Sequence, residues 1–154
     1  MKYTLEKREL RAFTVPGEPV PKARPRVSKN TKRAYTPKKT VAYEQRVRES
    51  YYNAYPDEKP FPAGTMVAAF IIAYYPVPKS ATKKQRADML AGRIFKTTRP
   101  DGDNIEKAIF DALNGMAYDD DGQICYQTCQ KRYAEQPRAE VKLYRLVQSG
   151  EEAK

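Results

Sequence analysis

The most apolar stretch of the chain, residues 65–75 (TMVAAFIIAYY), sets the first limit on the fold. It is rich in β-branched and aromatic side chains, and Gly64 and Pro76 bound it on either side. A helix needs about 20 apolar residues to cross a bilayer, so this stretch predicts no membrane span. Its length and flanks instead predict a central strand that is buried on both faces.

Periodic apolar residues predict helices on either side of this strand. In the first helix, Tyr43, Val47 and Tyr51 recur four residues apart and share one face. Thr40 is the expected N-cap, and the helix should end before Pro56. The other two predicted helices cover residues 80–92, with Ser80 as N-cap and Gly92 as the stop, and residues 103–114.

Alternating residues predict further strands, and the segments between them have loop composition. Residues 17–27 are rich in proline and should be extended or looped, and residues 28–37 suit a hairpin tip or a mobile loop. The predicted strands are residues 10–16, 93–100, 123–134 and 138–147, the last two joined as a hairpin. This order predicts the α+β class, with a mixed or antiparallel sheet packed against two or three helices. We expect one domain over residues 1–147 and a disordered tail at residues 148–154.

The chain contains no histidine, and this excludes more functions than any residue that is present. Zinc sites built on histidine, nucleases with a histidine base, and Ser-His or Cys-His hydrolases are all excluded within this chain. Cys125 and Cys129 lie four residues apart in one predicted strand, so about 13 Å separates them. That distance is too long for a disulfide, and both are predicted to be buried thiols.

The net charge is +10, and it is unevenly distributed. Residues 1–50 carry fourteen basic and five acidic side chains, whereas residues 100–124 carry seven acids and a single lysine. A basic protein with one dense acidic segment favours a polyanionic partner and a divalent metal at one place. A basic solvated surface is the simpler alternative. The amino terminus carries Glu and Lys where a signal peptide needs apolar residues, which predicts a cytoplasmic protein.

The acidic segment combines a helix with a following turn. At 100° per residue, Asp103, Lys107 and Asp111 share the polar side of the helix, and Asp101 lies just before it. A short turn then leads to three consecutive carboxylates at residues 119–121. Clustered carboxylates repel one another unless a cation lies between them. Oxygen ligands of this kind suit Mg²⁺, which can support phosphodiester hydrolysis.

Each part of this segment also has a purely structural interpretation. Asp103 and Glu106 fit a capping box at the start of the helix. Asp103 and Lys107 could form an exposed ion pair, and the three aspartates could lie in a solvated turn. A calcium loop does not fit, because Ala117 and Thr128 occupy its first and twelfth ligand positions.

The segment resembles the signature of the RusA family of Holliday-junction resolvases. That signature reads D-x-D-N-x-x-K-x-x-x-D-x-L, followed by a pair of aspartates, a small residue, Gln and an aliphatic residue. The matching positions here are Asp101, Asp103, Asn104, Lys107, Asp111, Leu113, Asp120, Asp121, Gly122, Gln123 and Ile124. The stretches GEPVPKARPRV and YTPKKTVAYE also look like openings of phage-related members, so the resemblance covers most of the chain.

The resemblance implies a homodimeric, Mg²⁺-dependent endonuclease that cuts four-way DNA junctions symmetrically in recombination and repair, often encoded by prophages. Carried over by position, Asp101, Asp103 and Asp121 are metal-binding catalytic residues, with Asp120 as a further candidate ligand. Lys107 corresponds to the essential lysine. The chain departs from the pattern in a third acid, Asp119, and a shorter turn before the pair. Mn²⁺ is expected to substitute for Mg²⁺.

The basic residues before the acidic segment are expected to grip DNA phosphates. Lys22, Arg24 and Arg26 alternate, so they share one face if that segment is extended. The predicted DNA-binding set is Lys22, Arg24, Arg26, Lys29, Lys32, Arg33, Lys96 and Arg99, the last two by loose correspondence to the family. Two alternatives stay open: a non-catalytic basic DNA-binding protein, and a metal nuclease that acts on other branched or duplex DNA.

Overall fold

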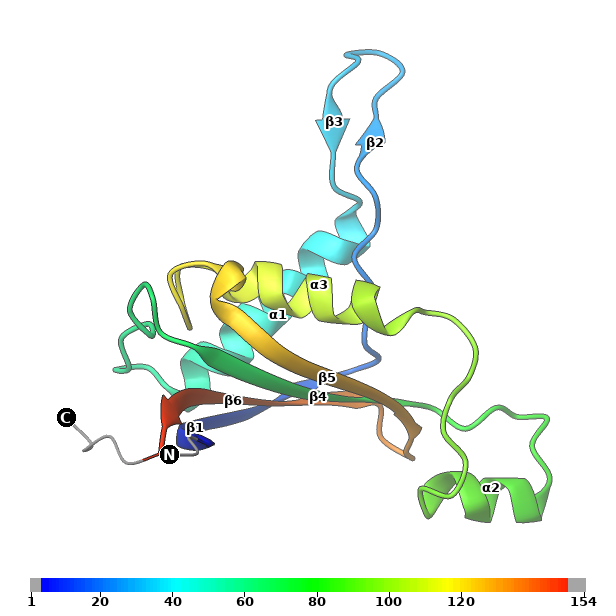
Figure 1. Cartoon of the computed structure of the whole chain (residues 1–154). Helices are drawn as coiled ribbons and strands as arrows, with labels where there is room; N and C mark the ends of the chain where they lie inside the picture. Colours follow the sequence, from blue (N-terminus) through cyan, green and yellow to red (C-terminus); the bar gives the residue numbers. More distant parts are fainter. Residues whose placement is uncertain (1–3, 150–154) are drawn as a thin grey trace.

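A four-stranded mixed sheet with helices packed on one face organises the computed structural model, which describes residues 4–149 (Figure 1). The strand order is β1-β6-β4-β5, in which β4 and β5 are parallel and the other neighbours are antiparallel. The elements are β1 (Leu5–Pro16), β2 (Arg26–Val27), β3 (Ala34–Tyr35), α1 (Lys38–Ala54), β4 (Val67–Tyr75), α2 (Lys83–Leu90), α3 (Gly102–Leu113), a 3₁₀ turn (Asp121–Gln123), β5 (Ile124–Tyr133) and β6 (Arg138–Gln148). The predicted α+β class, with a mixed sheet and three helices, is confirmed.

The central strand is β4, as predicted, but only one of its faces is fully buried. Alternate residues such as Val67, Ala69 and Ile71 are at most 1% exposed and join the core beneath the helices. On the other face, Phe70 is half-buried and its ring lies 5.7 Å from those of Tyr126 and Tyr144. The prediction of burial on both faces is therefore wrong, because α1 and α3 cover one side of the sheet only (Figure 1).

Two of the predicted helix starts are also wrong. α1 begins at Lys38, after Pro37, so Thr40 lies inside the helix, buried, rather than at its N-cap. α2 has Thr82 as its N-cap instead of Ser80, and Thr82 and Gln85 form a reciprocal capping box. Pro37 takes the N-cap position of α1, where its carbonyl accepts from the N–H groups of Thr40 and Val41. The Thr-x-x-Gln pattern at the α2 start is a stronger capping signal than Ser80.

Residues 93–100 do not form the predicted strand. Within the described chain, this segment makes one sheet-like bond, from the N–H of Lys96 to the carbonyl of Lys131 in β5. Its apolar side chains are used in packing, since Phe95 lies under the guanidinium of Arg132 at 4.6 Å. The predicted hairpin of β5 and β6 is wrong as well, because β4 lies between them.

A short antiparallel hairpin, residues 26–35, leads into α1, and a hairpin tip was one of the two alternatives that the sequence left open for residues 28–37. We call it the hairpin arm. It consists of β2, β3 and the turn between them, which is closed by the N–H of Ser28 donating to the carbonyl of Arg33 at 3.0 Å. The hairpin arm projects away from the sheet beyond the first turn of α1 (Figure 1).

The remaining sequence predictions concern the thiols, the tail and the membrane. Cys129 is half-buried but Cys125 is exposed, so the prediction of two buried thiols is wrong for Cys125. β6 continues to Gln148, and the N–H of Ser149 donates to the carbonyl of Thr4 at 2.6 Å. The rest of the predicted tail, residues 150–154, lies outside the described residues. No helix within residues 4–149 is long and apolar enough to cross a membrane.

Arg11 of β1 carries a buried charge that the sequence pattern did not predict. It is 7% exposed, and its guanidinium lies 3.8 Å from the centre of the Phe61 ring. It also donates to the hydroxyl of Tyr51 at 2.9 Å, which ties β1 to α1. Arg11 thus links the sheet, α1 and the connector that precedes β4.

We predict that Arg11→Met lowers the free energy of unfolding by about 2–4 kcal/mol, because it removes a buried cation–π contact and leaves Tyr51 without its donor. The matched control is Arg8→Met on the same strand. Arg8 forms an exposed ion pair with Glu6, so its loss should change stability by less than about 1 kcal/mol. Urea unfolding followed by circular dichroism measures both, and equal effects would contradict the proposed role of Arg11.

Candidate functional site

Helix α3 places the predicted catalytic residues, because its apolar face is buried completely. Ile105, Ile109 and Leu113 are all 0% exposed, so the opposite face, which carries Asp103 and Lys107, is directed outward. The helix begins after Asp101, which occupies the N-cap position without a side-chain capping bond. The capping box suggested for Asp103 and Glu106 is therefore wrong: Asp103 lies in the first turn.

Three carboxylates gather at the start of α3, and we call Asp101, Asp103 and Glu106 the N-terminal acidic group. Asp101 and Asp103 are exposed, whereas Glu106 is half-buried and its Oε2 atom has no partner among residues 4–149. Burial, and secondly the charge of Asp103, raises the pKa of Glu106. Burial also raises the pKa of the neighbouring Cys129 thiol to about 12, and Glu106 adds to that effect. None of the three carboxylates forms an ion pair within residues 4–149, so this end of the helix has no paired counter-charge there.

The segment before Asp101 is held against β5 by one lysine. The ammonium of Lys131 donates to the carbonyl of Thr98 at 2.9 Å and to that of Pro100 at 3.1 Å. These bonds, with the Lys96 N–H bond described above, fix the segment from which Asp101 projects.

A second set of carboxylates lies at the other end of α3, and we call Asp111, Asp120 and Asp121 the C-terminal acidic group. Two lysines balance part of its charge. The ammonium of Lys22 lies 3.3 Å from the carboxylate of Asp111, and that of Lys107 lies 3.7 Å from it. Lys107 therefore pairs with Asp111 rather than with Asp103, which was the ion pair considered from the sequence.

The turn at residues 119–121 has a defined structure that separates its aspartates by role. The Asp120 carboxylate accepts from the N–H of Gly122 at 2.9 Å and so closes the 3₁₀ turn. A Cβ atom at Gly122 would lie 2.8 Å from that carboxylate oxygen, so a larger residue there would push the Asp120 side chain out of this position. The N–H of Asp121 donates to Oδ1 of Asn114 at 2.8 Å, which ties the turn to the end of α3.

The electrostatics of this end follow from its burial and its neighbours. Partial burial, followed by the neighbouring Asp111 and Asp120, raises the pKa of Asp121. Burial alone would lower the pKa of Lys22, but its bonds to Glu44 and Asp111 outweigh that effect and raise the pKa. Lys22 is therefore held as a cation between two acids.

The three carboxylates assigned to the metal by resemblance do not meet within one chain. α3 has twelve residues, so its ends lie about 18 Å apart at 1.5 Å per residue. Asp101 and Asp103 lie at one end, and Asp121 lies beside Asn114 at the other. Among residues 4–149, no group of three or more His, Cys, Asp or Glu side chains is arranged to hold a metal ion. One copy of the chain alone does not fit the predicted Mg²⁺ site.

The predicted DNA-binding residues fall into two groups. Lys22 and Lys96 are engaged inside the protein, Lys22 with Glu44 and Asp111, and Lys96 over the ring of Tyr75 at 5.1 Å. The exposed ones are Arg24, Arg26, Lys29, Lys32, Arg33 and Arg99. Five of these lie on or next to the hairpin arm, and Arg99 lies beside Asp101.

Several residues that build the site were not assigned a role from the sequence. The Gln123 side chain accepts from the N–H groups of Asp119 and Asp120 and donates to the carbonyl of Pro62, so it holds the aspartate turn. Arg48 of α1 donates to the carbonyl of Ala112 at 3.0 Å, in the last turn of α3. Gln123 belongs to the family signature, which could have indicated it. Arg48 carries no local sequence signal, because its partner lies 64 residues away.

Two comparisons with known proteins bear on this site. Residues 16–144 match the family described as Endodeoxyribonuclease RusA, and this span includes both acidic groups, Lys107 and the hairpin arm. The chain is also 36% identical over 133 residues to "Uncharacterized protein YqaN" of Bacillus subtilis (strain 168). That alignment covers 84% of this chain and 92% of the relative.

We predict that Lys22→Met lowers the free energy of unfolding by about 1–2 kcal/mol, because it leaves two half-buried carboxylates without their shared cation. Arg24→Met is the matched control, since Arg24 is exposed and should be neutral for stability. For DNA binding we expect the opposite order, so Arg24→Met should reduce the affinity for a junction more than Lys22→Met does. Urea unfolding and a junction-binding titration together test this, and a neutral Lys22→Met would contradict the structural role.

Proposed function

The chain belongs to the RusA endodeoxyribonuclease family, and from this we propose that it cuts four-way DNA junctions by paired symmetric nicks, with Mg²⁺ as cofactor. The matched span includes Asp101, Asp103, Lys107 and Asp121, the four residues proposed as catalytic. This activity would serve DNA recombination and repair. We propose branched DNA as the substrate class.

The observation that carries this proposal is the state of Asp101 and Asp103. Both are exposed, and within residues 4–149 neither side chain makes a capping hydrogen bond to α3 or forms an ion pair. Exposed acids at the start of a helix gain some stability from the helix dipole. Two unpaired carboxylates close in sequence to Arg99 are nevertheless better explained by metal binding than by a role in stabilising the fold. The structural interpretations considered from the sequence do not account for them.

At the carboxyl end of α3, Asp120 and Asp121 differ in whether their carboxylates are already used in hydrogen bonds to the turn. Because the Asp120 carboxylate is used to close its turn, Asp121 is the better candidate as a metal ligand. Mg²⁺ at these oxygens would offset the negative charge that develops on the phosphate during hydrolysis, and Mn²⁺ should replace it. Lys107 is 60% exposed and lies midway along α3, where it can contact a phosphate.

The distance between the carboxylates favours a metal site shared by two copies of the chain. In a homodimer whose α3 helices run antiparallel across a two-fold axis, the start of one helix faces the end of the other. Asp101 and Asp103 of one copy would then lie beside Asp121 of its partner. A two-fold dimer would also hold two such sites, one for each of the two equivalent strands of a junction.

The hairpin arm supplies the proposed grip on the DNA arms. Lys29, Lys32 and Arg33 lie exposed on its turn, and Arg24 and Arg26 lie at its base. Each phosphate that such residues neutralise releases counterions, so junction binding should weaken steeply with salt.

We predict that Asp103→Asn and Asp121→Asn each reduce junction cleavage by about a thousandfold or more, because the amide cannot replace a carboxylate as metal ligand. Binding should be unchanged or tighter, since a charge that repels phosphate is removed. Lys107→Ala should also remove cleavage with only a small loss of binding. End-labelled four-way junction, Y-fork and linear duplex, each with Mg²⁺ or with EDTA, provide the measurement.

Asp119→Asn is the matched control, because Asp119 is exposed and belongs to neither acidic group. Its cleavage rate should stay near that of the native chain. Wild-type cutting by the Asp103→Asn and Asp121→Asn variants would refute the site. Equal cutting of linear duplex would identify a nuclease with a different substrate, and binding without any cutting would indicate a DNA-binding protein.

We predict that mixing the inactive Asp103→Asn and Asp121→Asn chains restores nicking. A shared site pairs position 103 of one copy with position 121 of the other, so each mixed dimer has one native site and one doubly substituted site. Random exchange should then give roughly a quarter of native nicking, as single rather than paired cuts.

The control mixture combines Asp101→Asn with Asp103→Asn. Both positions lie at the same end of α3, so every site keeps one substitution and activity should stay absent. If the first mixture also stays inactive although the two chains exchange subunits, the site is built within one copy.

A further inference from the structure

We propose that a cavity beside Asp101 binds one unpaired deoxynucleotide of the DNA substrate, an inference that rests on the proposed function. The cavity has a volume of about 510 Å³, is open to solvent on one side, and is lined by Tyr75 at the end of β4 and by three further segments of the chain. The three further segments are the proline-rich segment after β1, the first half of α1, and the residues just before α3. We call it the nucleotide cavity. Its volume lies within the range typical of small-molecule sites.

One polar group in the wall of the nucleotide cavity lacks a partner. Tyr43 of α1 is 1% exposed, and its hydroxyl has no hydrogen-bond partner among residues 4–149. Buried hydroxyl groups in native proteins are almost always bonded. Burial raises the pKa of Tyr43, although the nearby charge of Arg46 opposes this, so the hydroxyl stays protonated at neutral pH. The hydroxyl is covered by protein atoms in the free chain, so it can bond to a base or a sugar oxygen only when binding shifts the residues around it.

The charges around the nucleotide cavity favour a phosphate. Lys39, Arg46 and Arg99 contribute three cations against the single carboxylate of Glu18. None of the three cations forms an ion pair within the described chain, and Arg46 has only a long 3.4 Å contact with the carbonyl of Pro16. These three side chains could therefore neutralise a phosphate bound in the nucleotide cavity.

The remaining walls suit a base. Pro19, Val20, Ala42 and Pro100 line the cavity together with Tyr43 and contribute apolar surface. Apolar walls with a few polar groups are the usual way in which an unstacked base is held once it leaves the helix. The cavity ends at Arg99 and Pro100, so a nucleotide bound in it would lie directly before Asp101.

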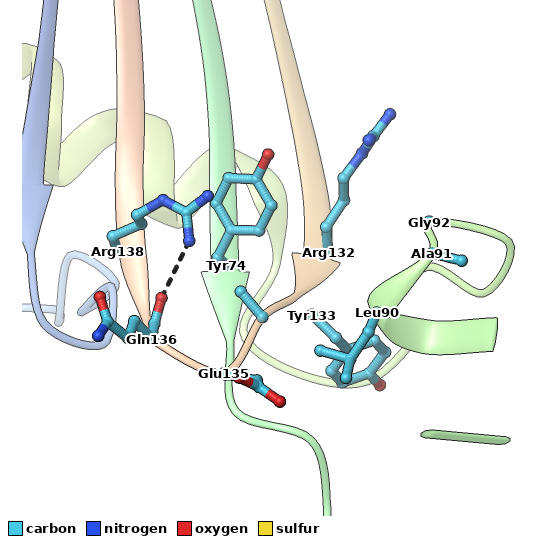
Figure 2. Close-up of a pocket in the computed structure, with 10 residues that line it drawn as sticks. Tyr74, Leu90, Ala91, Gly92, Arg132, Tyr133, Glu135, Gln136 and Arg138 are labelled. Atoms are coloured by element: carbon cyan, nitrogen blue, oxygen red, sulfur yellow. Dashed lines mark hydrogen bonds between the residues drawn. The ribbon is translucent and has the colours of Figure 1, made fainter. Parts of the chain in front are cut away.

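A second cavity of about 460 Å³ lacks these features and serves as a contrast (Figure 2). Its cation Arg138 lies 4.0 Å from the centre of the Tyr74 ring and donates to the carbonyl of Gln136 at 3.2 Å. Arg132 in its wall is likewise engaged, over the ring of Phe95. With these charges already engaged, the second cavity gives no comparable indication of a ligand.

The direct test titrates the full chain, in EDTA, with each deoxynucleoside monophosphate and follows the tyrosine-ring and methyl resonances by NMR. We expect saturable shifts of Tyr43 and Val20 at millimolar concentration. Tyr43→Phe and Arg46→Gln should each weaken binding by about fivefold or more. The matched controls are Tyr52→Phe, on the exposed side of α1, and Arg86→Gln in α2, which should leave affinity unchanged.

Two results of this titration would overturn the proposal. One is the absence of shifts at Tyr43 and Val20. The other is equal affinity for inorganic phosphate, which would show an anion site that does not hold a base. Because EDTA prevents metal-dependent cleavage, nucleotide binding is measured whether or not the protein cuts junctions. Nucleotide binding by a chain that cuts no DNA would thus refute the proposed function only.

A second measurement places the nucleotide in the context of a junction. A junction with 2-aminopurine at the branch point should gain fluorescence when the native chain binds, because a base that leaves the stack is no longer quenched. Tyr43→Phe and Arg46→Gln should lose most of this gain while still binding the junction. An unchanged gain in both variants would place the displaced base elsewhere and overturn the proposal.

Discussion

The burial of one face of α3 is the constraint on which the rest of the site depends. Ile105, Ile109 and Leu113 are fully buried, and each such side chain contributes about 1.5–3 kcal/mol. A helix held along its whole length by such contacts stays straight and cannot bring its two ends together. Carboxylates before its first turn and after its last are therefore kept apart by the same packing that makes the core.

The two ends of α3 also differ in charge balance, and this bears on how two copies would meet. The C-terminal acidic group has Lys22 and Lys107 beside Asp111, whereas the N-terminal acidic group has no paired cation within residues 4–149. Contact between like ends would place the uncompensated carboxylates of two copies against each other. Antiparallel contact instead places the N-terminal acidic group of each copy beside the partly neutralised C-terminal acidic group of the other. A divalent cation can balance the negative charge that remains.

Sequence patterns predicted the elements that depend on local periodicity. The α1 face of Tyr43, Val47 and Tyr51 and the central position of β4 both follow from such patterns. The predictions that were wrong concern contacts between distant parts of the chain. β4 separates β5 from β6, and the segment at residues 93–100 uses its apolar side chains against β5 instead of joining the sheet.

The same distinction applies to the site. The signature identified the residues at both ends of α3, but no spacing along the chain reports that Lys22 reaches Asp111, 89 positions later. The separation of the carboxylates follows from helix geometry alone, since twelve helical residues span about 18 Å. The signature could therefore name the ligands of a site without indicating how many chains build it.

Residues 97–100 connect the nucleotide cavity to the N-terminal acidic group, and they lack the support of a sheet. On one side, Lys131 holds this segment through the carbonyls of Thr98 and Pro100. On the other side, Arg99 and Pro100 line the nucleotide cavity. A nucleotide bound there and a cation bound at Asp101 would thus act on the same short stretch of backbone. Because a ligand that orders a segment lowers the cost of ordering it for the next one, recognition of the unpaired nucleotide would favour binding of the metal.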